Sequence, residues 1–341
     1  MLYVGLDVHK SFTTMGMFDP ATGELQELGN VPTRQPELTE ALAKIEGPKT
    51  VVLEAGRKSH WVAAMVEPCA QAVWIVDPLE VRRLQGRRPK TDRRDAGALA
   101  RWAAQGALTP LWRPDAQTMN LRELTRGRAA LVRMETKVRN MIRSLLARHG
   151  LEPPKGDLLS EKLQAWLEEA PLGGYGGKML EVLRALLPVL RAAAQSLTQP
   201  VEQEAGAHAQ ARRLMTIPGI GPVLGLTMAA EIGDISRFPS SAHLRSYSGL
   251  CPRVSASGAR THTGPLTKSG NRWLRWGAVL GAQQIANKTK VDPRLKRLLR
   301  RVAFRWGCNP AKVAVARALL DLIWHLLTKE EDWQPPLAQA A

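Results

Sequence analysis

The sequence predicts a multidomain protein that combines an N-terminal mixed α/β domain with mainly α-helical domains. Its 341 residues are too many for one ordinary core and suit two or three domains. Short β-prone runs alternate with amphipathic helices over the first hundred residues, and leucines at heptad spacing follow in the middle. We therefore expect domains at residues 1–112, 113–205 and 206–330, followed by a tail at 331–341.

The first domain is predicted to follow the order β-β-β-α-β-α-β-α. A turn at residues 19–23 separates the second and third strands, and Pro89 must interrupt the last helical region. Three antiparallel strands followed by alternating units describe a mixed sheet with helices on both faces, which is the ribonuclease H-like arrangement. The strands are expected at residues 2–8, 11–18, 24–30, 50–53 and 72–76, and the helices at 36–45, 59–70 and 79–105.

Four carboxylates of this domain form a candidate metal site. Asp7 lies within the first strand, Glu54 ends the fourth strand, and Asp92 and Asp95 share one face of a helix because they are three residues apart. A buried ionised carboxylate needs a partner, and functional groups collect at strand ends in open α/β sheets. Converging carboxylates suit Mg²⁺ or Mn²⁺, and a pair of such ions could activate a nucleophile and stabilise a leaving oxygen in phosphodiester chemistry.

Asp92 and Asp95 also have a purely structural interpretation. On a solvated helix they could form ion pairs with neighbouring arginines. Taken alone, this is the better interpretation of the two aspartates, whereas the four carboxylates together favour a metal site. The arginines in question are Arg87, Arg88, Arg93 and Arg94.

The middle of the chain is predicted to form a helical hairpin with a coiled-coil signature and a basic outer face. Pro153 and Pro154 stop the first helix, residues 173–177 form a hinge or exposed loop, and Pro188 kinks or splits the second helix. The seam either packs within a bundle or forms an intermolecular coil. On the first helix it consists of Leu124, Leu131, Met134, Val138, Met141 and Leu145, and on the second helix of Leu183, Leu190 and Leu197. The basic residues are Arg122, Arg126, Arg128, Arg133, Lys137, Arg139, Arg143 and Arg148.

The C-terminal domain, mainly α-helical, has features that suit nucleic-acid binding. The P-G-I-G sequence at residues 218–221 is either a helix-hairpin-helix turn that offers amides to a phosphate or a plain tight turn. Residues 252–271 contain no acidic residue and are rich in glycine, hydroxyls and cations, which predicts an exposed phosphate-binding loop or ribbon. A serine there could act as a nucleophile, although composition alone favours a phosphate donor or a turn residue. A second basic cluster follows at residues 287–305.

The charge of the chain points to a polyanionic partner, most simply nucleic acid. The net charge is +17 and the pI is about 10.3. Residues 1–80 carry 6 basic and 11 acidic side chains, whereas residues 231–341 carry 18 and 7, so the charge is segregated.

Several other classes of protein are not supported. The three cysteines make no C-x-x-C pair, which argues against a zinc ribbon or a disulfide framework and fits a reducing cytoplasm. We expect no signal peptide, no Walker A loop and no membrane-spanning segment.

These motifs resemble those of the DEDD transposases of bacterial insertion sequences, whose best-understood members are bridge-RNA-guided recombinases. The N-terminal matches are GLDVHK at 5–10, LEAG at 53–56 and KTDRRDA at 90–96. The C-terminal matches are IPGIG at 217–221, YSGLCP at 247–252, SG at 257–258 and TKSGN at 267–271. The motifs lie at both ends of the chain, in order and at plausible spacing.

The resemblance implies a RuvC-like N-terminal domain, a coiled coil and a C-terminal transposase domain. Carried over, the carboxylates Asp7, Glu54, Asp92 and Asp95 would bind Mg²⁺, with Mn²⁺ as a substitute. Ser257, between Pro252 and Gly258, would be the nucleophile that joins to DNA, and Ser255 is the competing choice.

The resemblance also implies the partners. A noncoding guide (bridge) RNA would pair with donor and target DNA, and the protein would form a homodimer that assembles into a tetramer with composite sites. We expect nucleic acid to contact Arg87, Arg88, Lys90, Arg93, Arg94, Arg253, Arg260, Lys268, Arg272, Arg297, Arg300 and Arg301. The alternatives are a site-specific invertase or a RuvC-like junction nuclease that uses metal-activated water, and a non-enzymatic, basic coiled-coil protein that binds nucleic acid.

Overall fold

The computed structural model describes the backbone of residues 1–86, 92–257, 260–287 and 292–335, and the side chains of these residues except 92–94 and 254–263. The chain divides into two compact units, residues 1–113 and 114–341. No helix in the described ranges is long and apolar enough to cross a membrane.

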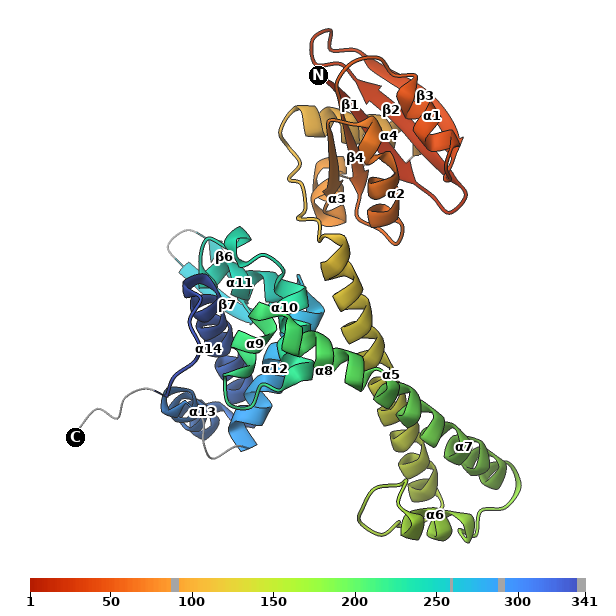
Figure 1. The fold of residues 1–341 in the computed structure, drawn as a ribbon, viewed down its shortest axis with the longest axis vertical. Coiled ribbons are helices and arrows are strands. Elements are labelled where there is room, and N and C mark those ends of the chain that lie inside the picture. The colour runs from red at the N-terminus through yellow and green to blue at the C-terminus, as the bar shows by residue number, and fades with distance from the viewer. Residues whose placement is uncertain (87–91, 258–259, 288–291, 336–341) are drawn as a thin grey trace, which may run out of the picture. The chain divides into compact units, whose positions relative to one another are not determined.

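The first unit is built on a five-stranded mixed sheet with the strand order β3-β2-β1-β4-β5 (Figure 1). Strands β1, β2 and β3 are antiparallel neighbours, whereas β4 and β5 run parallel to β1. The predicted element order is confirmed, and the sheet is compatible with a ribonuclease H-like fold. The strands are β1 (Leu2–Val8), β2 (Phe12–Phe18), β3 (Leu25–Pro32), β4 (Lys49–Glu54) and β5 (Ala72–Val76). The helices are α1 (Glu37–Ala43), α2 (Ser59–Val66), the 3₁₀ turn η1 (Glu67–Cys69), α3 (Pro78–Gln85) and α4 (Asp92–Ala104).

Alternation along the strands gives the sheet two buried faces. Leu6 and Leu53 pack with α1 and α2 on one face. Val52 packs with Leu99 of α4 on the other face. Helix α4 lies directly on β1, because a Cβ atom at Gly5 would fall 1.9 Å from a backbone oxygen of α4. Only glycine permits this approach, and it places α4 against the strand that carries Asp7.

The second unit is almost entirely helical. Helix α10 is buried on all sides and packs against α5, α8, α9 and α12, which makes it the centre of the core. The helices are α5 (Ala116–Arg148), α6 (Glu161–Glu168), α7 (Gly174–Ser196), α8 (Thr198–Ala207), α9 (Ala209–Met215), α10 (Pro222–Ile232), the 3₁₀ turn η2 (Ile235–Arg237), α11 (Ser241–Ser248), α12 (Arg272–Asn287), α13 (Pro293–Trp306) and α14 (Cys308–Lys329). The strands β6 (Pro252–Ser257) and β7 (Arg260–Leu266) form a two-stranded antiparallel ribbon.

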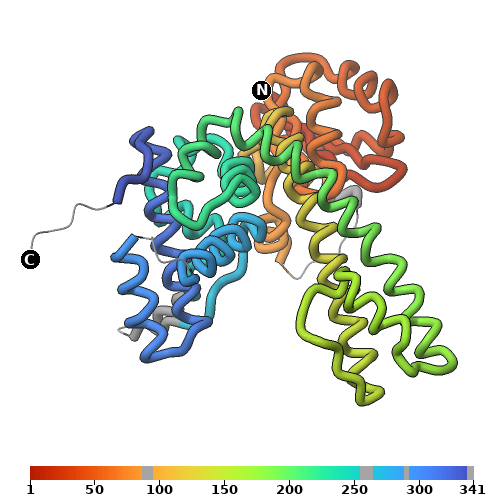
Figure 2. The backbone as a smooth tube through the Cα atoms, turned by 60° about the horizontal axis from the view of Figure 1, so that its bottom comes forward, coloured from red at the N-terminus to blue at the C-terminus, as the bar shows by residue number. Residues whose placement is uncertain are grey.

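Helices α5 and α7 lie side by side as a hairpin in both views (Figures 1 and 2). The predicted seam is only partly on the packed face. Val138 and Leu145 are buried with Ile142 against α7, whereas Met134 and Met141 are 53% and 40% exposed. The reason is that a straight α-helix drifts from a strict seven-residue repeat, so the buried face moves to Ile142.

The second helix of the hairpin is not split at Pro188, and it begins within the glycine segment predicted to be a hinge or exposed loop. Pro188 lies inside α7, which is continuous from Gly174 to Ser196. Leu183 and Leu187 before Pro188 are buried, and Leu190 after it is partly buried, in one cluster with Ile142 of α5. This packing holds the helix to α5 and offsets the lost hydrogen bond. Most of the predicted glycine loop forms the first turn of α7, where amides need no intrahelical acceptor.

The predicted basic outer face of α5 is also partly wrong. Arg122 is buried, and Arg126 and Arg139 form ion pairs with Glu231 and Glu135. The Glu135–Arg139 pair is local, because the two residues are four positions apart on one helix. The sequence pattern does not show, however, that Arg126 will meet a carboxylate more than 100 residues away.

Candidate active site

Asp7 and Glu54 lie side by side at the ends of two neighbouring parallel strands. Leu6 of β1 pairs with Leu53 of β4, so Asp7 and Glu54 are one residue further in the same register. They share the face of Gly5 and Val52, which is the face covered by α4. Both line a groove of about 520 Å³.

His9 is a site residue that the sequence analysis missed. Its Nε2 lies 3.1 Å from Oδ2 of Asp7, and it lines the same groove. The signal was its spacing, because His9 comes two residues after Asp7 and just past the end of β1, where an extended backbone places both side chains on one face. Lys10, Arg57 and Lys58 also line this groove and give it a cationic rim suited to phosphate.

Asp95 and Asp92 lie in the first turn of α4. Oδ1 of Asp95 accepts a hydrogen bond of 3.2 Å from Nε2 of Gln85 in α3. The side chain of Asp92 is outside the described residues, as are residues 87–91 and the side chains of Arg93 and Arg94. Among the side chains that the structure describes, no three His, Cys, Asp or Glu residues form a group that could hold a metal ion. The donor set of Asp7 and Glu54 does fit a hard cation in its chemistry, since both offer carboxylate oxygens.

The predicted serine loop is the ribbon of β6 and β7. Ser257 is the last residue of β6 and pairs with Arg260, and Ser255 pairs with His262. The side chains of all four are outside the described residues, as are Gly258 and Ala259 altogether. Arg253, Lys268 and Arg272 have exposed side chains. Arg253 lies near the start of β6, Lys268 lies just after β7, and Arg272 begins α12.

The chain segments that enter and leave the ribbon are joined by backbone hydrogen bonds. The amide of Thr267 donates to the carbonyl of Cys251 (2.9 Å), and that of Asn271 donates to Tyr247 (2.6 Å). Gly249 has φ +69°, and a Cβ there would lie 2.3 Å from the carbonyl oxygen of Ser269. The glycine is therefore required where the chain enters and leaves the ribbon.

A buried carboxylate, Glu231 of α10, connects this region to α5. Glu231 is fully buried, and Arg126 donates to its two oxygens at 2.7 and 2.8 Å. Nδ2 of Asn271 donates to Oε2 of Glu231 (2.7 Å). Arg122 donates to the carbonyls of Ala230 and Glu231 at 2.8 and 3.0 Å. The arginines of α5 and the carboxylate of α10 are more than 100 residues apart, so no local pattern in the sequence indicates this network.

Asn271 also immediately precedes α12 and caps its N-terminus. Its Oδ1 accepts hydrogen bonds from the amides of Trp273 (3.0 Å) and Leu274 (2.9 Å). The same side chain therefore satisfies amides at the start of α12 and contacts Glu231. This links the TKSGN motif to the core of the unit.

The second basic cluster lies on α13, where Arg297, Arg300 and Arg301 are exposed. Asp292 caps this helix, accepting a 2.8 Å hydrogen bond from the amide of Arg294. Burial alone would raise the pKa of Asp292, but the hydrogen bonds and charge of Arg294 outweigh it and hold that pKa below its usual value. The P-G-I-G turn lies between α9 and α10, as expected from the sequence.

The sequence matches two models of transposase families. A DEDD transposase model of the IS110 type matches residues 4–150, and the model of the transposase IS116/IS110/IS902 family matches residues 211–303. A probable family 20 transposase of Pseudomonas aeruginosa is 28% identical over 84% of this chain and 86% of the relative. The transposase for insertion sequence element IS1111A of Coxiella burnetii is 29% identical, over 83% and 79%.

A carboxylate-bearing mixed sheet joined to a basic helical unit, together with these matches, defines the class: the protein is a DNA transposase, and hence an enzyme. The chain belongs to the IS110/IS116/IS902 family of insertion-sequence transposases. This membership sets aside the non-enzymatic alternative.

Proposed function

We propose that the protein cuts and rejoins DNA strands with Mg²⁺-binding carboxylates and the nucleophile Ser257. The observation that carries this proposal is that Asp7 of β1 and Glu54 of β4 lie next to each other, in the same register, on the sheet face covered by α4. That helix begins with Asp92 and also contains Asp95. The four residues thus come from three elements that pack together.

Asp7, Glu54, Asp92 and Asp95 would hold Mg²⁺, or Mn²⁺ in its place. A bound ion of this kind stabilises negative charge on the phosphate oxygens. The chain's own residues have separate tasks: His9 orients the Asp7 carboxylate, and the cations at the rim of the groove attract the DNA phosphate.

Ser257 would carry the covalent step. Its Oγ bonds to phosphorus as the bond to a deoxyribose oxygen breaks, and the serine proton leaves while the released oxygen gains one. The product is a serine phosphodiester and a free hydroxyl end. A hydroxyl of another strand then attacks the same phosphorus and releases the serine. Because one phosphodiester is exchanged for another, no external energy source is needed.

A noncoding guide RNA and an oligomer complete the proposal. The segregated positive charge of the second unit suits binding of both DNA and RNA. A dimer that assembles into a tetramer would bring one protomer's carboxylates to the serine of another, which gives a composite site.

The test is strand cleavage on denaturing gels, with a covalent protein–DNA adduct as the second readout. Ser257→Ala should abolish both, whereas Ser255→Ala should retain both. Asp7→Ala should abolish Mg²⁺-dependent cleavage and leave DNA binding largely intact. Cleavage by Ser257→Ala without an adduct would instead support a RuvC-like nuclease that uses water.

A further inference from the structure

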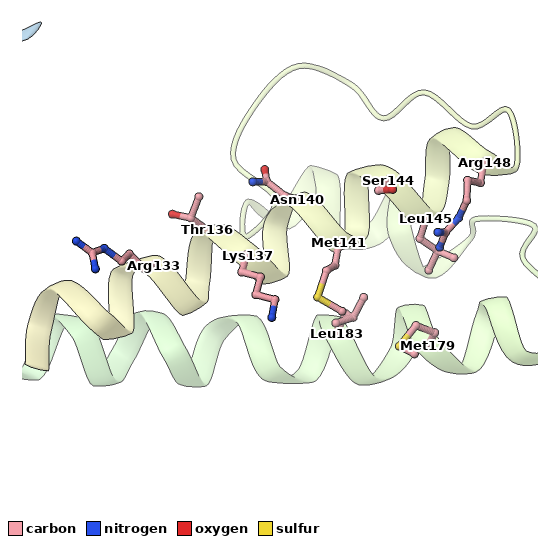
Figure 3. Close-up of a pocket in the computed structure, with 10 residues that line it drawn as sticks. All are labelled: Arg133, Thr136, Lys137, Asn140, Met141, Ser144, Leu145, Arg148, Met179 and Leu183. Carbon is pink, nitrogen blue, oxygen red and sulfur yellow. The ribbon is translucent and has the colours of Figure 1, made fainter. Parts of the chain in front are cut away.

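One face of the α5–α7 hairpin forms an open groove that the proposed chemistry does not use. The groove has a volume of about 550 Å³. Lys137 and Met141 extend from α5 toward α7, whose Met179 and Leu183 face them (Figure 3). Leucine and methionine thus form its floor, and polar and cationic groups stand along α5.

The polar groups along α5 follow helical spacing. Arg133, Lys137, Asn140, Ser144 and Arg148 are separated by 4, 3, 4 and 4 residues, so they share one stripe of the helix. All five are exposed. The fifteen steps from Arg133 to Arg148 span about 22 Å at a rise of about 1.5 Å per residue. This length corresponds to about six base pairs of duplex at roughly 3.4 Å each.

The groove continues into a second one of about 680 Å³, because Arg133 and Thr136 line both. The second groove is also lined by residues 219–222, which include the end of the P-G-I-G turn, and by Trp276. The guanidinium of Arg133 lies 4.3 Å from the ring centroid of Trp273, which fixes this cation where the two grooves meet.

The charge of these two continuous parts, called the combined groove below, favours a polyanion as the bound partner. No Asp or Glu is among the described residues that line either part. The nearby Glu135 and Glu181 pair with Arg139 and Lys178 instead. A second copy of the hairpin in this groove would bring like charges together, whereas the phosphates of DNA would neutralise them.

We propose that this groove binds the backbone of double-stranded DNA flanking the site of strand exchange, with Lys137 and Arg148 contacting phosphates. The inference rests on the proposed function for its substrate, but not on the serine or the carboxylates. Contacts of this kind set affinity and register and read no base sequence.

The test compares Lys137→Ala/Arg148→Ala with Arg143→Ala/Lys155→Ala, a control that removes two exposed cations outside the groove. Duplex DNA binding is measured from 0.05 to 0.3 M salt. Two lost phosphate contacts should make the negative slope of log K against log[salt] less steep by about 2. They should also weaken binding roughly 10- to 100-fold near 0.1 M salt. The control should retain the slope of the wild type.

Three outcomes would overturn the proposal. An unchanged slope would show that the groove does not bind DNA. A loss confined to structured RNA would assign the groove to RNA, and an altered oligomeric mass in light scattering would assign it to contacts between copies. Thermal melting by circular dichroism should match between the two variants. If wild-type protein binds DNA with the expected slope but forms no adduct, the serine mechanism fails and this inference stands.

Discussion

Replacing the buried Glu231 by alanine should destabilise the second unit by about 3 kcal/mol. Removing one partner of a buried ion pair costs about 3–5 kcal/mol, because the other charge is left uncompensated. The lower end applies here, since Arg126 is 37% exposed and retains some solvation. Arg122 also keeps the carbonyl oxygens of Ala230 and Glu231.

The control for this prediction is Glu123→Ala, which removes an exposed carboxylate from α5 and should change stability by less than about 0.5 kcal/mol. Stability is measured by urea unfolding of the full chain. Hydrogen exchange at the amides of Trp273 and Leu274 should accelerate in Glu231→Ala, because Asn271 loses its partner. A cost no larger than that of the control, with unchanged exchange, would refute the account of this network.

Three further predictions concern the first unit and α13. Gly5→Val should unfold or misdock α4 and abolish cleavage, since its side chain would overlap the helix backbone, whereas Gly206→Ala, with nothing within 4 Å, should melt like the wild type in circular dichroism. His9→Ala should raise the Mg²⁺ concentration needed for half-maximal cleavage by about 10-fold, and an unchanged titration would remove its proposed role. Asp292→Ala should cost about 1 kcal/mol at pH 7 in urea unfolding. Because the pKa of Asp292 is lowered in the folded protein, this stability difference should persist above about pH 4 and shrink as the pH falls further. A difference that does not depend on pH would contradict the capping role of Asp292.

The sheet and two of its carboxylates were predictable because their signals are local. Alternation and turn residues defined the strands, and Asp7 and Glu54 stood out as charges at the ends of apolar runs. His9 was visible in principle from its spacing to Asp7. These residues depend only on neighbours along the strand or in register with it.

The parts that escaped prediction depend on distant packing. Glu231 and its arginines meet across more than 100 residues, and Asn271 acquires its partner only when α10 and α12 fold together. The exposure of Met134 likewise follows from where α7 lies against α5. Helical spacing reports which residues share a face, but not which face is covered.

The proposed mechanism requires that a serine of the β6–β7 ribbon join covalently to DNA. The most direct measurement is mass spectrometry of the DNA-linked peptide after protease digestion of an adduct trapped with Mg²⁺. We expect a phosphodiester link to Ser257 that is absent from Asp7→Ala. A link to any other residue, or Mg²⁺-dependent cleavage with no linked peptide, would contradict it.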